Sequence, residues 1–175
     1  MKILYLTGLN NKDNVTDYLR DMTLHGLRKL FGENVIDYPG CWPMYKDELK
    51  KRNFNLDNLW GRGFNIYGTL TNYNNIDRSD IKKKIEKKFF DLVIFGSIRR
   101  SDDFLDDIIK YNNKFIFIDG EDDQFINNKY SNKSLYFKRE LLTKEKNLIP
   151  ISFSVPKEKI IQDINNKPFF LIAPL

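Results

Sequence analysis

The sequence has very few of the residues on which most catalytic and metal-binding motifs depend. Its 175 residues include one cysteine, Cys41, and one histidine, His25. A single cysteine cannot form an internal disulfide, which favours a reducing compartment. There is no set of cysteines and histidines at metal-ligand spacing, no nucleophile elbow and no Walker loop. These absences exclude the common zinc-site, serine-hydrolase and P-loop motifs.

Long apolar runs and a dominant sign of charge are also lacking. No segment approaches the roughly 20 apolar residues that a membrane-spanning helix requires. The N-terminal residues MKILYLTGLNN have neither the apolar length nor the cleavage site of a signal peptide, so we expect a cytoplasmic protein with no membrane span. Lysine and arginine number 29 against 24 acidic residues, and this mixture gives only weak support for nucleic-acid binding.

What the sequence does contain is three short apolar runs that each lead into a glycine. They are ILYLTG (3–8), DLVIFGS (91–97) and FIFIDG (115–120). Such runs are typical of strands buried on both faces. A polar or helix-like segment follows each of them, which predicts an α/β fold: a three-layer Rossmann-like domain with a mostly parallel sheet. Ligands of these sheets bind beyond the carboxyl ends of the strands, so candidate residues should follow Thr7, Phe95 and Asp119.

The segments between the runs are expected to contain helices. Periodicity predicts a helix over 14–31 with Asp13 or Asn14 as its N-cap. Its expected buried stripe comprises Val15, Leu19, Met22, Gly26 and Leu30. Further helices are predicted over 46–52 and 78–90, after Ser101, and over 157–164. Additional short strands are predicted over 35–38, from 135, and in the apolar stretch 148–153.

Residues 39–75 interrupt this pattern with a long, aromatic-rich excursion. Ordinary connections have about 4–6 residues, and the aromatic content argues against disorder. We therefore expect the excursion to fold over the edge of the sheet or over its ligand-binding rim. Residues 1–165 would form the Rossmann-like domain, and 166–175 would be either the start of a second domain or a C-terminal strand.

Candidate substrate-binding residues lie at the ends of the three predicted strands. Backbone amides after Gly8 could bind an oxygen at the amino end of a helix. Arg99 and Arg100 could grip a phosphate or carboxylate, or could instead pair with nearby acidic residues. The expected set is Gly8, Leu9, Asn10, Gly96, Ser97, Arg99, Arg100, Gly120 and Glu121.

Two residues are candidates for a catalytic base. Asp119 ends a buried strand, where an ionised carboxylate needs either a partner or a ligand. His25 lies in the middle of a predicted helix, where a structural histidine is the simpler interpretation and a base is the alternative. The GEDD segment, 120–123, could bind magnesium, although a solvated loop that caps the next helix is the simpler interpretation.

Five segments occur in order along the chain: MKILYLTG, FDLVIFGS, FIDGED, YFKREL and LIPISFSVP. In this order they resemble the N-terminal half of GT-B glycosyltransferases, in particular the bacterial spore-protein (CgeB-like) branch. The most specific segment is Tyr136–Glu140 with the proline-containing stretch that follows. The resemblance implies the acceptor-side domain of an enzyme that moves a sugar from a nucleotide-sugar donor to a hydroxyl acceptor.

The resemblance also implies how the reaction would be divided between domains. The donor would bind a C-terminal domain that these 175 residues do not include, so the chain alone is expected to be inactive. His25 or Asp119 would accept the proton of the acceptor hydroxyl. No cofactor and no bound metal are expected.

Two other classes of function remain open: a non-catalytic flavodoxin-like binding or regulatory domain, and a basic nucleic-acid-binding module. A phospho-receiver would need an acidic pair after the first strand, where Gly8, Leu9 and Asn10 stand. The basic segment 82–88 lacks the interleaved aromatic residues of a nucleic-acid surface. Saturable sugar binding would favour the glycosyltransferase, whereas steeply salt-dependent binding would favour nucleic acid.

Overall fold

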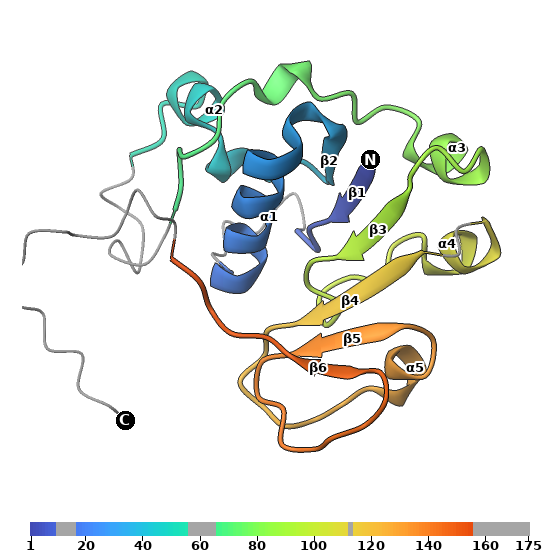
Figure 1. The fold of residues 1–175 in the computed structure, drawn as a ribbon. Coiled ribbons are helices and arrows are strands. Elements are labelled where there is room, and N and C mark those ends of the chain that lie inside the picture. Colours follow the sequence, from blue (N-terminus) through green and yellow to red (C-terminus); the bar gives the residue numbers. More distant parts are fainter. Residues whose placement is uncertain (10–16, 56–65, 112–113, 156–175) are drawn as a thin grey trace, which may run out of the picture.

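A computed structural model describes residues 1–9, 17–55, 66–111 and 114–155. Six strands form one sheet in the order β2-β1-β3-β4-β5-β6, and every neighbouring pair is parallel (Figure 1). The strands are β1 (Ile3–Leu6), β2 (Val35–Tyr38), β3 (Leu92–Phe95), β4 (Phe115–Asp119), β5 (Leu135–Lys138) and β6 (Leu148–Pro150). The predicted α/β, Rossmann-like fold is confirmed. The chain reverses its direction across the sheet between β1 and β3, which makes this pair the topological switch point.

Helices lie on both sides of the sheet. They are α1 (Tyr18–Phe31), α2 (Lys46–Lys51), α3 (Ile81–Glu86), α4 (Leu105–Tyr111) and α5 (Asn128–Ser131). One face is covered by α1, as the hydrogen bond from the Tyr5 hydroxyl of β1 to the Arg20 carbonyl of α1 shows (2.8 Å). On the other face, Tyr130 of α5 contacts Phe117 of β4. Right-handed crossovers from β3 to β5 place α4 on the same side as α5. Within the described ranges, no helix is long and apolar enough to cross a membrane.

The first helix differs from its prediction in both its start and its buried face. It begins at Tyr18, where the Asp17 side chain caps it by accepting from the Arg20 amide at 3.0 Å. Leu19 is buried as expected, but Leu30 is 77% exposed, so the predicted stripe is wrong. Arg20 and Asp21 turn inward instead, since they form a buried ion pair at 2.7 Å that periodicity of apolar residues cannot reveal. The predicted caps at positions 13 and 14 lie outside the described residues.

Two other helices are shorter than predicted because left-handed residues limit them. Asp80 (φ 48°) and Lys88 (φ 54°) flank α3, so the predicted helix over 78–90 is reduced to six residues. Phe104 (φ 61°) precedes α4, which therefore starts four residues after Ser101. The predicted helix over 46–52 is confirmed as α2. The predicted helix over 157–164 and the terminal segment 166–175 lie outside the described residues.

The excursion after β2 is anchored by one buried carboxylate, Asp37. One of its oxygens accepts from Arg78 at 2.6 Å and from the Tyr45 hydroxyl at 3.0 Å. The other accepts from the Cys41 amide at 2.8 Å. A backbone pairing between Tyr45 and Leu70 closes the excursion on itself. Residues 39–55 and 66–75 are thus tied to the carboxyl end of β2, next to the switch point.

Candidate functional site

The predicted residues of the three strand ends lie together at the carboxyl edge of the sheet. A Cβ atom on Gly8 would lie 3.1 Å from the Ser97 carbonyl and 3.2 Å from the Arg100 Cβ. The turn after β3 is joined to β4, because the Ile98 amide donates to the Ile118 carbonyl at 3.0 Å. The predicted residues that share this edge are Gly8, Gly96, Ser97, Arg99, Arg100, Asp119, Gly120 and Glu121. Two groups can be distinguished among them and their partners.

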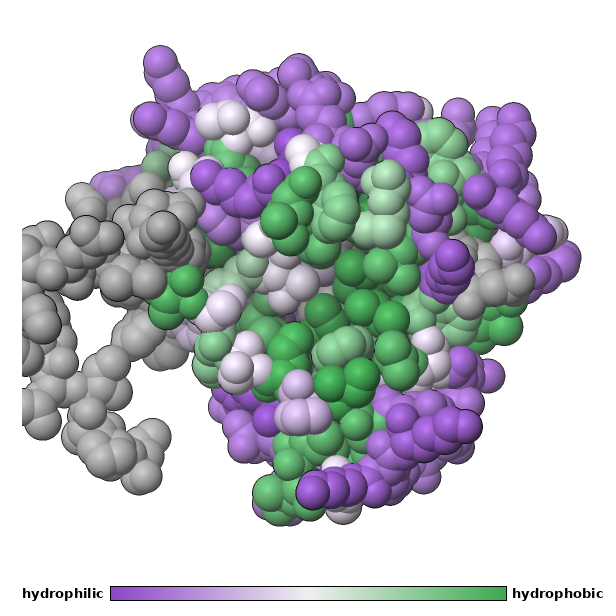
Figure 2. Space-filling model, in the orientation of Figure 1, coloured by the Kyte–Doolittle hydropathy of each residue, from purple (hydrophilic) through white to green (hydrophobic). Residues whose placement is uncertain are grey.

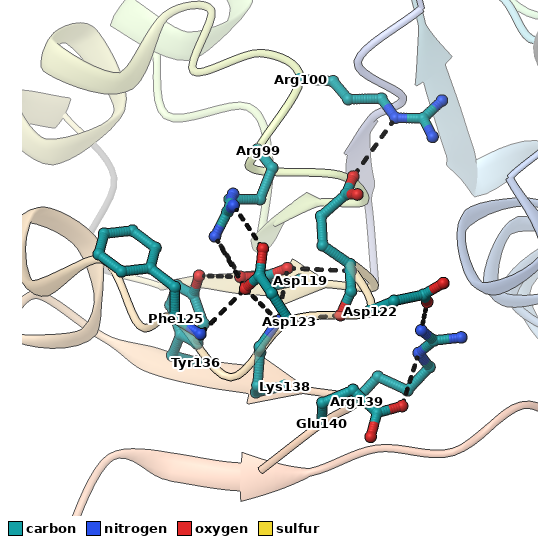
Figure 3. Close-up of polar contacts among 11 residues, drawn as sticks. Arg99, Arg100, Asp119, Asp122, Asp123, Phe125, Tyr136, Lys138, Arg139 and Glu140 are labelled. Carbon is teal, nitrogen blue, oxygen red and sulfur yellow. Dashed lines mark hydrogen bonds and ion pairs between the residues drawn. The ribbon is translucent and has the colours of Figure 1, made fainter.

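The first group, which we call the buried cluster, consists of Arg99, Asp119, Asp123, Tyr136 and Lys138 (Figure 3). Asp119 and Lys138 are both 0% exposed. The Tyr136 hydroxyl donates to Asp119 at 2.5 Å, and the Lys138 ammonium lies 3.3 Å from the other Asp119 oxygen. Arg99 bonds Asp123 at 2.9 Å and lies 3.7 Å from Asp119. The register of the sheet brings Asp119 and Lys138 together, since they are direct neighbours across β4 and β5.

The charges of the buried cluster cancel. Two cations, Arg99 and Lys138, face two carboxylates, Asp119 and Asp123, and Tyr136 is neutral. Asp119 also accepts the Glu121 amide at 3.1 Å, so both of its oxygens have donors supplied by the chain itself. Asp119 and Lys138 are fully buried, and burying these two charges carries a desolvation cost that only such close pairing offsets, whereas the Asp123 side chain is 48% exposed. The buried carboxylate predicted from sequence is therefore satisfied without a ligand.

Proton affinities within the cluster follow from this pairing. Burial, followed by the hydrogen bond to Asp119, raises the pKa of the Tyr136 hydroxyl well above its ordinary value, so it remains a donor. Burial alone would raise the pKa of Asp123, but the Phe125 amide, Arg99 and Lys138 together hold it below the ordinary range. Burial likewise acts to lower the pKa of Arg99, and the two carboxylates outweigh it. Near neutral pH these shifts keep the Tyr136 hydroxyl protonated, the Asp123 carboxyl ionised and the Arg99 guanidinium charged.

The second group, which we call the switch-point group, consists of Gly8, Asp17, Ser97, Arg100 and Glu121. Arg100 is 32% exposed in its side chain and Glu121 is 40% exposed. The Arg100 guanidinium lies 3.6 Å from Asp17 and 3.8 Å from Glu121, beyond hydrogen-bond length in both cases. Among the described residues it has no hydrogen-bond partner. In contrast to Arg99, it retains donors for a molecule bound at this edge.

An exposed aromatic ring adjoins the buried cluster, on the Arg99 side of the edge (Figure 3). Phe125 is 58% exposed, and the Arg99 guanidinium lies over its ring at 5.1 Å from the centroid. Its amide is fixed by Asp123 at 2.9 Å. The carboxyl edge therefore presents an apolar ring face beside the buried cluster, in addition to the charged side chains of the switch-point group.

The structure does not bring His25 to this edge. Its ring lies under the excursion, with Nδ1 3.1 Å from the Thr69 hydroxyl. That hydroxyl donates to the Ile66 carbonyl at 2.8 Å, so the proton of the His25–Thr69 bond belongs to Nδ1. His25 is six residues beyond Leu19, the α1 residue beside Gly120, which is about 9 Å along the helix axis. This placement fits the structural interpretation of His25.

The remaining predicted residues have different surroundings. A Cβ atom on Gly96 would fall 2.4 Å from the Tyr5 ring, so close packing explains this glycine. Leu9 is half-buried, and its amide lies 3.4 Å from the Thr7 hydroxyl. Asn10 lies outside the described residues. The idea that the GEDD segment caps the next helix is wrong, because Asn127 caps α5 and Asp123 instead pairs with Arg99.

Sequence reasoning missed Asp17, Tyr136 and Lys138 as members of the edge. Tyr136 and Lys138 are two residues apart on one strand and therefore share a face. A lysine in an otherwise apolar strand was the available signal. Within the described part of the chain, no three histidine, cysteine or carboxylate side chains are grouped to hold a metal ion. Comparisons of the chain with known protein families, with curated proteins and with solved structures find no match.

Proposed function

We propose that this chain is the acceptor-side domain of a GT-B glycosyltransferase, which transfers a sugar from a nucleotide-sugar donor to a hydroxyl acceptor. The observation that carries the proposal is the switch-point group. It combines an exposed cation and an exposed carboxylate at the edge where parallel α/β sheets bind ligands. The order of sequence motifs, which resembles this class, supports the same function.

The chemistry of the edge suits a saccharide. Sugar hydroxyls both donate and accept, so Glu121 can receive a hydroxyl proton while Arg100 donates to hydroxyl oxygens. The ion pairs of Arg100 are long, so a ligand would displace little existing hydrogen bonding. The exposed ring of Phe125 offers an apolar surface to the C–H face of a pyranose.

In the proposed reaction, the acceptor oxygen forms a bond to the anomeric carbon while the bond from that carbon to the donor phosphate breaks. The electron pair leaves with the nucleoside diphosphate, and the hydroxyl proton passes to a base. Among the predicted residues at the edge, Glu121 is the carboxylate that an acceptor can reach. Asp119 has a positioning role in this scheme, because it holds the 120–123 turn and Arg99. The donor would be held by a second domain.

Ligand-observed saturation-transfer NMR tests the proposal with the 175-residue chain and a panel of saccharides and nucleotide sugars. We expect saturable binding of at least one saccharide. Arg100→Gln should weaken it about tenfold, because a hydrogen bond to a charged group contributes about 1.5–3 kcal/mol. Lys82→Gln is the matched control, since it also removes one charge and one long surface pair, to Asp107 at 3.5 Å. Equal weakening by both variants, or no saccharide binding, would refute the proposal.

A second candidate is a non-catalytic flavodoxin-like binding domain, which the order of the first five strands favours. It makes a different prediction for the same panel. Compounds that carry phosphate would bind at the edge, and neutral saccharides would not. Nucleic-acid binding would instead show a steep loss of affinity with added salt.

A further inference from the structure

The two faces of the sheet can be distinguished from the register of the strands. Cβ atoms on Gly96 and Gly120 would meet Tyr5 and Leu19, so these glycines point to the side of α1. Residues two positions earlier on the same strands share that direction. Pairing then extends the face, which we call the α1 face, to six apolar residues in two rows: Ile94, Ile116 and Leu135, and Ile118, Phe137 and Ile149.

Coverage of the two faces is unequal. On the face opposite α1, the apolar residues of β3, β4 and β5 are each 9% exposed or less: Val93, Phe95, Phe115, Phe117 and Tyr136. On the α1 face, Ile94 and Ile118 are buried, but Leu135 is 41% exposed. Ile116, Phe137 and Ile149 are only partly buried. Figure 2 shows the result, a broad apolar surface over the sheet beside α1.

Such a surface is not expected on strands of this kind. Parallel sheets in α/β proteins are covered by helices on both faces, and β3, β4 and β5 are apolar on both. The described helices supply that cover on the far face but leave β4 to β6 open beside α1 (Figure 1). A contiguous apolar patch on a soluble protein marks a surface that another segment or molecule contacts.

After β6 the chain leaves the carboxyl edge of the sheet and passes the start of α1 (Figure 1). Phe153 meets the ring of Tyr18, at the start of α1, edge-on with 6.2 Å between centroids. The Arg139 guanidinium lies over the Phe153 ring at 4.7 Å. Phe153 is therefore at the carboxyl edge on the same side of the sheet as α1, two residues before the last described residue. The next residues in the sequence are PKEKIIQDI (156–164).

The pattern and length of 156–164 match the open surface. Ile160, Ile161 and Ile164 recur at a spacing that places them on one side of a helix, with lysine and acidic residues on the other. A helix of eight residues is about 12 Å long, and a strand of four residues is about 13 Å long. One such helix beside α1 would span the strands from end to end. We propose that residues 156–164 pack as a helix on the α1 face over β4 to β6.

A labelling experiment on the 175-residue chain tests this proposal. The native thiol, Cys41, is 0% exposed, so labelling by a maleimide reports on a cysteine introduced by Leu135→Cys and not on Cys41. We expect it to react at least tenfold more slowly than a cysteine introduced by Leu142→Cys, a loop position that is 72% exposed. Adding Ile160→Asp and Ile164→Asp should remove that protection, whereas adding Lys159→Asp should not.

Three outcomes would overturn the proposal. Leu135→Cys could react as fast as Leu142→Cys, or its protection could survive the two aspartates. Protection that falls on dilution would instead assign the surface to a second copy of the chain. Circular dichroism and the continued protection of the Cys41 thiol, which is 0% exposed, confirm that each variant is folded.

Discussion

Replacing Lys138 with methionine tests the buried cluster most severely. The side chain keeps its approximate length but loses the ammonium, which lies 3.3 Å from Asp119 and donates to the Glu121 carbonyl at 3.0 Å. Asp119 would remain 0% exposed, with Arg99 as its nearest cation at 3.7 Å. Removing one partner of a buried ion pair costs about 3–5 kcal/mol, because the other charge stays buried. For a chain of this size, that loss lowers Tm by roughly 10 °C.

Urea unfolding followed by circular dichroism measures this loss. Lys133→Met, an exposed lysine in the turn before β5, is the matched control and should change stability by less than about 0.5 kcal/mol. Adding Asp119→Asn to Lys138→Met removes the orphaned charge. The double variant should therefore lose about 1–3 kcal/mol less of its free energy of unfolding than the two single losses add up to. A loss below about 1 kcal/mol for Lys138→Met, or strict additivity, would refute the reasoning.

Two further predictions use the same unfolding assay. Gly96→Ala should destabilise the protein by about 1–3 kcal/mol, because its Cβ would overlap the buried Tyr5 ring, while Gly26→Ala should stabilise it by about 0.5–1 kcal/mol, because its Cβ meets nothing within 4 Å. Equal effects would show that packing against Tyr5 does not explain Gly96. The pKa values of Asp123 and Asp102 are lowered in the folded chain, so their contribution is complete above the unfolded pKa and is lost as pH falls below about 4. The urea midpoint should therefore drop in acid, and Asp123→Asn should flatten that drop; a midpoint that ignores pH would contradict the assignment.

The sheet could be predicted from sequence because the information is local. Short apolar runs that lead into glycine define β1, β3 and β4, and continuous apolar sequence of this kind indicates strands that are buried on both faces. The buried face of α1 could not be predicted in this way. Arg20 and Asp21 are buried as a pair, at 2.7 Å, and only their tertiary surroundings decide that they turn inward. The ends of α3 were missed because Asp80 and Lys88 adopt left-handed conformations that residues other than glycine seldom show.

The candidate site was predictable in part for a similar reason. Strand ends fixed which turns meet, so Gly8, Arg100 and Glu121 could be grouped without coordinates. Lys138 could not be assigned to Asp119, because their contact depends on the register between β4 and β5. The two adjacent arginines also diverge: Arg99 is bonded to Asp123 at 2.9 Å, while Arg100 is not hydrogen-bonded to its acidic neighbours. A difference of one position in the turn thus decides which guanidinium is hydrogen-bonded to an acidic neighbour.

The central claim is that a saccharide binds at the carboxyl edge of this sheet, and amide NMR tests it most directly. The chain would be labelled with nitrogen-15 and titrated with each saccharide that the saturation-transfer screen identifies. Our account predicts saturable shifts of the Ser97, Arg100 and Glu121 amides, which are lost in Arg100→Gln. Shifts confined to the opposite edge, at Lys2 and Lys114, would contradict it, as would an unchanged spectrum with every sugar.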